Sequence, residues 1–134
     1  MRLEVSGQIE CLAELNAGLQ TEWSRLELPE EQLFPFELSL EEIFTNVVKY
    51  GQDATEPARV IVTLTRDGDS VVMEISDSGF AFDPLLAATP DTSLDIDDRA
   101  IGGLGIHLVR EMMTRVDYER RDGYNVLTMH KDLA

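Results

Sequence analysis

Residues 59–76 read RVIVTLTRDGDSVVMEIS, which is two strand-forming runs separated by a short polar turn. β-Branched residues dominate Arg59–Arg66 and recur in Ser70–Ser76, as is typical of strands. Asp67-Gly68 lies between the runs, and Asp-Gly in this setting is the strongest short-range signal for a β-hairpin. The stretch predicts paired antiparallel strands and disfavours a Rossmann fold, in which single strands alternate with helices.

A second hairpin is predicted near the end of the chain. Val116–Arg121 and Tyr124–Lys131 flank another Asp-Gly, Asp122-Gly123. Leu3–Val5 is a further candidate for a short strand. Sequential hairpins predict a mixed, mostly antiparallel sheet.

Three amphipathic helices are predicted around these strands. Gln8–Leu26 carries Leu and Trp at spacings of three and four residues. Pro29–Tyr50 follows as a second helix, which Pro35 is expected to split or kink. Gly103–Thr114 is the third. Three helices on one face of the sheet would give an α/β (α+β) two-layer sandwich.

Length and charge restrict the class of protein further. The 134 residues suit a single domain over 1–134. A net charge of −15 argues against unaided binding to nucleic acid or to an anionic membrane. Cys11 is the only cysteine, and no stretch approaches the roughly 20 apolar residues of a membrane span. We therefore expect a cytoplasmic protein. Its charge is compatible with a basic protein partner, or with a phosphorylated small molecule at a site that supplies hydrogen-bond donors.

The second predicted helix carries a carboxylate and an amide one turn apart. Glu42 and Asn46 lie four residues apart and so share a helix face. A carboxylate beside an amide oxygen suits a general base and a hard cation. The spacing alone, however, favours two solvent-exposed helix residues.

The second predicted strand ends in Asp77-Ser78-Gly79. An aspartate at a strand end can accept a hydrogen bond from an exocyclic amine, and a glycine lets a flat ring approach the backbone. Taken alone, the tripeptide is typical of a turn.

The third predicted helix begins at a glycine-rich stretch, Ile101-Gly102-Gly103-Leu104-Gly105. Free backbone N–H groups at a helix start favour an anion, although a flexible hinge explains the glycines equally well. The stretch is no Walker A motif, because Gly-Lys-Ser/Thr is missing. His107, just inside the helix, fits a structural residue better than a catalyst.

In order and spacing the three motifs together resemble the GHKL (Bergerat) ATPase/kinase superfamily. In detail they are similar to the bacterial anti-sigma factor serine/threonine kinases of the RsbW and SpoIIAB group. The corresponding boxes are Glu42–Asn46 with Gly51, Asp77–Gly79 with Phe82-Asp83-Pro84, and Gly102–Gly105. The resemblance covers roughly residue 38 to the C-terminus and implies a Bergerat, histidine-kinase-like ATPase fold. Tyr50 departs from it, since many relatives carry His there.

The resemblance also implies a site for ATP and Mg²⁺. Glu42 would be the catalytic base and Asn46 the metal ligand, while Asp77 would accept from the adenine amino group and Gly79 would let adenine pack on the backbone. The other implied nucleotide contacts are Gly102, Gly103, Leu104 and Gly105 around the phosphates, Lys49 and Arg99 as neutralising cations, and Asn125 near an adenine-bound water. About residues 81–101 would form the ATP lid.

The implied activity is that of a serine/threonine protein kinase. Its substrate would be a STAS-type antagonist (an anti-anti-sigma-like protein), and an ATP-bound homodimer would sequester a sigma factor. We expect no sensor, membrane or phosphoacceptor-histidine segment ahead of the domain, which argues against a histidine kinase. Two alternatives stay open: a nucleotide-gated binding module without kinase activity, and an acidic adaptor that binds no nucleotide.

Overall fold

The computed structural model describes residues 1–53, 55–86 and 103–133. The strands are β1 (Arg2–Ser6), β2 (Arg59–Asp67), β3 (Ser70–Asp77), β4 (Arg115–Arg121) and β5 (Tyr124–Asp132). The helices are α1 (Leu12–Arg25), α2 (Phe34–Tyr50) and α4 (Gly103–Met112), with 3₁₀ turns at Ile9–Cys11 and Glu30–Gln32.

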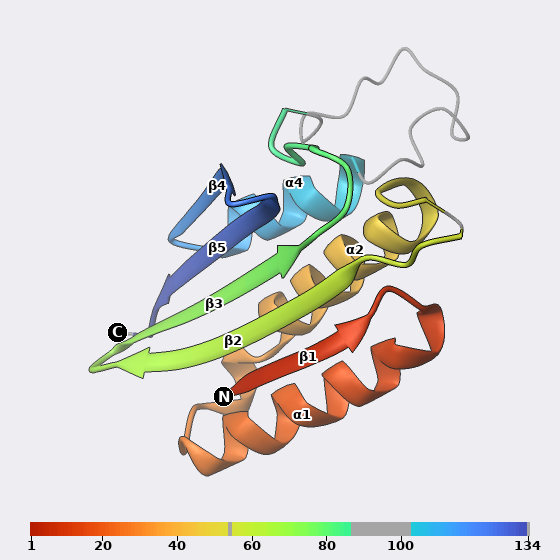
Figure 1. The fold of residues 1–134 in the computed structure, drawn as a ribbon. Coiled ribbons are helices and arrows are strands. Elements are labelled where there is room, and N and C mark those ends of the chain that lie inside the picture. The colour runs from red at the N-terminus through yellow and green to blue at the C-terminus, as the bar shows by residue number, and fades with distance from the viewer. Residues whose placement is uncertain (54, 87–102, 134) are drawn as a thin grey trace.

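The strands form one sheet in the order β1-β2-β3-β5-β4, and every neighbouring pair is antiparallel. The helices α1, α2 and α4 lie on one side of this sheet (Figure 1). The predicted two-layer α+β architecture is therefore confirmed, although the described strands pair only in antiparallel fashion and the sheet is not mixed. In the part of the chain that the structure describes, no helix is long and apolar enough to cross a membrane.

Both predicted hairpins form, but the turn of the first is displaced by one residue. Asp67 pairs with Ser70, so the two-residue turn is Gly68-Asp69 rather than Asp67-Gly68. Gly68 has a φ of 60°, which matches a type II′ turn with glycine at its first central position. In the second hairpin Asp122 (φ 54°) and Gly123 (φ 81°) are both left-handed, as a type I′ turn requires.

The prediction that a helix begins at Pro29 is wrong. Pro29 precedes the 3₁₀ turn Glu30–Gln32, and α2 begins only at Phe34. Pro35 lies in the first turn of α2, where the missing N–H has no partner to lose. The proline thus marks the start of the helix instead of kinking its interior.

The core lies between the sheet and the helices. Strand residues that face the helices are fully or almost fully buried, including Val60, Val62, Met73, Ile75 and Met129. An apolar stripe on α2 is buried against them: Leu40, Ile43, Phe44 and Val47. Burial of this stripe leaves Glu42 and Asn46 half-buried on the adjacent face of α2.

Candidate functional site

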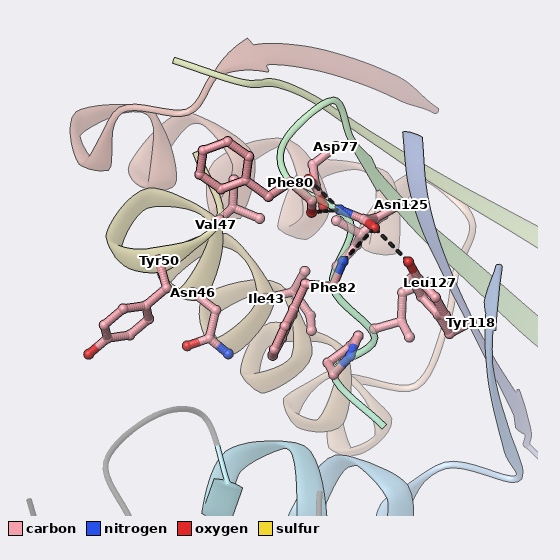
Figure 2. Close-up of a pocket in the computed structure, with 13 residues that line it drawn as sticks. Ile43, Asn46, Val47, Tyr50, Asp77, Phe80, Phe82, Tyr118, Asn125 and Leu127 are labelled. Carbon is pink, nitrogen blue, oxygen red and sulfur yellow. Dashed lines mark hydrogen bonds between the residues drawn. The ribbon is translucent and has the colours of Figure 1, made fainter. Parts of the chain in front are cut away.

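A pocket opens between α2 and the ends of β3 and β5 (Figure 2). It contains about 590 Å³ of empty space, including the part open to solvent. Ile43 and Val47 of α2 line it together with Ile75 and Leu127 of the sheet. The other lining residues are Asn46, Tyr50, Gly51, Asp77, Phe80, Phe82, Pro84, Tyr118 and Asn125. An apolar space with a few polar groups at its border suits a flat aromatic ligand.

Asp77 provides a buried carboxylate to this pocket. The residue is 5% exposed, and its Oδ1 accepts from the Gly79 N–H at 3.0 Å and from Asn125 Nδ2 at 3.0 Å. No described residue donates to Oδ2, so that oxygen can accept from a ligand. Burial raises the pKa of Asp77, against the lowering effect of the hydrogen bonds from Asn125 and Gly79 and of the Arg120 charge.

Gly79 lies against the end of α2. A Cβ at this position would overlap the carbonyl oxygen of Gly51, and the Phe80 N–H donates to the same oxygen at 2.7 Å. The close approach of two backbone segments thus requires glycine here. This contact fixes the exit of β3 beside the pocket, whether or not a ring also packs on Gly79.

Asn125 lies opposite Asp77 in the β3–β5 pairing and is 7% exposed. Its Nδ2 donates to Asp77 and, at 2.7 Å, to the Phe80 carbonyl. Its Oδ1 accepts from the Tyr118 hydroxyl at 2.6 Å and from the Phe82 N–H at 3.1 Å. Figure 2 shows these groups converging on one amide.

Farther along α2, Glu42 meets the first turn of α4. A Cβ at Gly105 would overlap Cγ, Cδ and Oε1 of Glu42, so the carboxylate packs directly on this glycine. Burial raises the pKa of Glu42, as does the charge of Glu41, while Lys49 lowers it. The structure therefore brings together two residues, Glu42 and Gly105, that lie far apart in the sequence.

Asn46 lies between these two ends of the site. It lines the pocket, and no described residue hydrogen-bonds to its side chain. Residues 42 and 51 are separated by about 13 Å along α2 at 1.5 Å per residue. Asp77 lies near the Gly51 end, because Gly79, two residues after it, contacts Gly51. From that end, the site therefore contains Asp77, then Asn46, then Glu42.

Of the two predicted basic residues, the structure describes Lys49 but not Arg99. Lys49 is exposed at the end of α2, within electrostatic reach of Glu42. Arg99, Gly102 and most of the predicted lid, from residue 87 onward, lie outside the described residues. Gly103 and Leu104 begin α4.

Arg120 and Tyr118 are site residues that the motifs did not indicate. Arg120 Nη1 donates to the Gly79 carbonyl at 3.0 Å, and its charge acts on Asp77. The register could have revealed both, because a two-residue turn at Asp122-Gly123 pairs Arg120 with Asn125. Residues 118, 120 and 125 must then share the face that carries the pocket.

These groups fit a magnesium nucleotide. The free Asp77 oxygen at an apolar slot suits a base with an exocyclic amine, and the start of α4 suits an anion. No group of three or more His, Cys, Asp or Glu side chains among residues 1–53, 55–86 and 103–133 could hold a metal by itself. Mg²⁺ commonly takes one or two protein oxygens and completes its shell with phosphates and water, which Asn46 would allow.

Comparison with known proteins identifies the class. The chain belongs to the family of histidine kinase-like ATPase domains, whose model matches residues 5–131. It is similar to the serine/threonine-protein kinase BtrW of Bordetella bronchiseptica (strain ATCC BAA-588 / NCTC 13252 / RB50). The two are 35% identical over 96 residues, which cover 72% of this chain and 68% of that protein. The predicted resemblance is confirmed, and membership of a family of ATPase domains supports the prediction that this protein uses ATP.

Proposed function

We propose that this protein is an ATP-dependent serine/threonine protein kinase. The observation that carries the proposal is the contact of Glu42 with Gly105, because it places a carboxylate at the start of α4, where the phosphates would bind. Asp77 would hold the adenine ring in the pocket, at the other end of the site. The similarity to a protein named a serine/threonine kinase supports this reading.

In the proposed reaction a seryl or threonyl hydroxyl of the partner attacks the γ-phosphorus of ATP. The new O–P bond forms as the bond to the β,γ-bridging oxygen breaks, and ADP leaves. Glu42 takes the hydroxyl proton as general base. Mg²⁺ on Asn46 would neutralise charge on the phosphates when bound. The raised pKa of Glu42 makes its carboxylate a stronger base than an exposed glutamate.

The proposed substrate is a STAS-type antagonist, and the proposed companion role is sequestration of a sigma factor by an ATP-bound homodimer in the cytoplasm. The charge of −15 supports the first of these roles, because a phosphate added to the antagonist would be repelled by this acidic chain, which would favour release of the product.

The test is transfer from γ-labelled Mg·ATP to a panel of STAS proteins at pH 8. Glu42→Gln keeps the shape of the side chain but cannot accept the proton. We expect it to lower transfer by about 10²-fold or more while Mg·ATP affinity changes little. Glu31→Gln, at an exposed position in the 3₁₀ turn before α2, makes the same change away from the pocket; it is the matched control and should transfer normally.

Full transfer by Glu42→Gln would remove Glu42 from the mechanism. Tight Mg·ATP binding without transfer to any protein would instead favour the nucleotide-gated binding module. Failure to bind Mg·ATP at all would favour the acidic adaptor.

A further inference from the structure

We propose that Asn125 and Tyr118 act as a positioning pair for nucleobase recognition: together they hold the Asp77 carboxylate and the Phe80–Phe82 wall in place without hydrogen-bonding to the ligand. The inference rests on the proposed nucleotide site and assigns a role to two residues within it.

The amide of Asn125 has no hydrogen-bonding capacity left for a ligand. An asparagine amide offers two N–H donors and an oxygen with two lone pairs. Asp77 and the Phe80 carbonyl take the donors, and the Tyr118 hydroxyl and the Phe82 N–H occupy the oxygen. Asn125 therefore lines the pocket but hydrogen-bonds only to protein groups.

The orientation of this amide is fixed by backbone groups. The Phe82 N–H can only donate and the Phe80 carbonyl can only accept, so oxygen and nitrogen cannot exchange places without losing both bonds. The Tyr118 hydroxyl must then donate, because the Asn125 oxygen can only accept. Every hydrogen bond in the network thus has one possible direction.

This direction determines which oxygen of Asp77 is available. Asn125 and Gly79 both donate to Oδ1, which leaves Oδ2 to accept an exocyclic amine. Loss of the pair would free the carboxylate to rotate and would release the backbone at Phe80 and Phe82. The contribution of the amine to binding should suffer most, because that hydrogen bond depends on the carboxylate geometry.

The experiment compares two nucleotides, Mg·ATP and Mg·purine riboside triphosphate, which lacks only the 6-amino group. Calorimetry gives the dissociation constants for both. For the wild type we expect a preference for ATP of about tenfold or more, the value of one hydrogen bond to a charged group. Tyr118→Phe, which keeps the ring, should reduce this preference at least threefold. Asn125→Leu should bring it close to one.

Tyr124→Phe is the matched control, because Tyr124 lies in the same hairpin but does not line the pocket. Its preference should equal that of the wild type. If the pair has a merely structural role, the variants should bind both nucleotides more weakly by the same factor. An unchanged preference for ATP in Tyr118→Phe and Asn125→Leu would therefore overturn this inference and leave the proposed function standing. If the wild type binds neither nucleotide, the proposed function falls together with it.

Discussion

At the scale of single residues, Asp77 carries a charge where burial disfavours one. Because its pKa is raised, the folded protein binds this proton more tightly than the unfolded chain does. The resulting stability is fully present below the ordinary aspartate pKa of about 4 and is lost as the pH rises through the folded pKa. Ionisation of this buried side chain as the pH rises therefore costs the protein some of its stability.

Asp77→Asn should uncouple stability from nucleotide binding. The variant keeps an oxygen for Asn125 and Gly79 but removes the charge, so without nucleotide it should be at least as stable as the wild type at pH 7. Its advantage should shrink toward zero as the pH falls below about 4. Its affinity for Mg·ATP should fall tenfold or more, because an amide N–H₂ would face the base amine.

Urea unfolding between pH 3.5 and 8 and calorimetry with Mg·ATP give the two readouts. Asp69→Asn, an exposed aspartate in the first hairpin turn, should change neither. A variant that is less stable than the wild type at pH 7, yet binds Mg·ATP normally, would mean that Asp77 supports the fold rather than the ligand.

At the scale of elements, α1 ends in a conformation that its sequence does not favour. Glu27 has a φ of 55°, its N–H bonds to the Ser24 carbonyl, and the Leu28 N–H bonds to the Trp23 carbonyl at 3.1 Å. These bonds define a Schellman motif, in which the left-handed position usually holds glycine. A side chain there strains the end of the helix.

Glu27→Gly should therefore stabilise the protein by about 0.5–1 kcal/mol, since relief of the strain exceeds the added entropy of the unfolded chain. Thermal unfolding should shift upward by roughly 1–4 °C. Glu30→Gly is the control: Glu30 is also exposed but has no left-handed backbone, so glycine should destabilise the protein there or leave it unchanged. Equal shifts for both variants would contradict the assignment.

Local elements were predictable because their signals are local. Asp122-Gly123 determined the second hairpin, and the apolar periodicity of α2 determined which face is buried. The first turn lies one residue later than predicted, because Gly68 can be the first central residue of a type II′ turn as readily as the second central residue of an Asp-Gly type I′ turn. The order of the sheet was not predictable, since the position of β1 beside β2, and of β5 between β3 and β4, depends on long-range packing.

The same division holds for the candidate site. Motif order indicated Glu42, Asn46 and Asp77; in the structure Asn46 and Asp77 line one pocket, and Glu42 lies one turn of α2 away from Asn46. The contact of Glu42 with Gly105 joins two helices that are distant in the sequence, so no local pattern could indicate it. Tyr118 carries no motif and becomes visible only through the strand register.

At the scale of the whole molecule, the charge of −15 opposes the compact state. The chain has 26 acidic and 11 basic residues, and some of the basic ones are paired at the surface, such as Arg59 with Glu4 at 2.8 Å and Arg115 with Asp117 at 2.6 Å. Such exposed pairs contribute little each, whereas the excess of like charge repels over the whole surface. The balance predicts a destabilising net electrostatic term at low salt.

Added NaCl should therefore stabilise this protein. Between 10 and 150 mM the screening length falls from about 30 to about 8 Å, which removes long-range repulsion before it affects paired charges. Thermal unfolding should rise by a few degrees over this range. A variant with three exposed changes, Glu30→Gln, Glu31→Gln and Glu41→Gln, should respond less, because it repels itself less at the start. A melting temperature that falls with salt in the wild type would instead show that the surface ion pairs outweigh the repulsion. The acidic composition would then reflect a requirement for binding rather than a cost to folding.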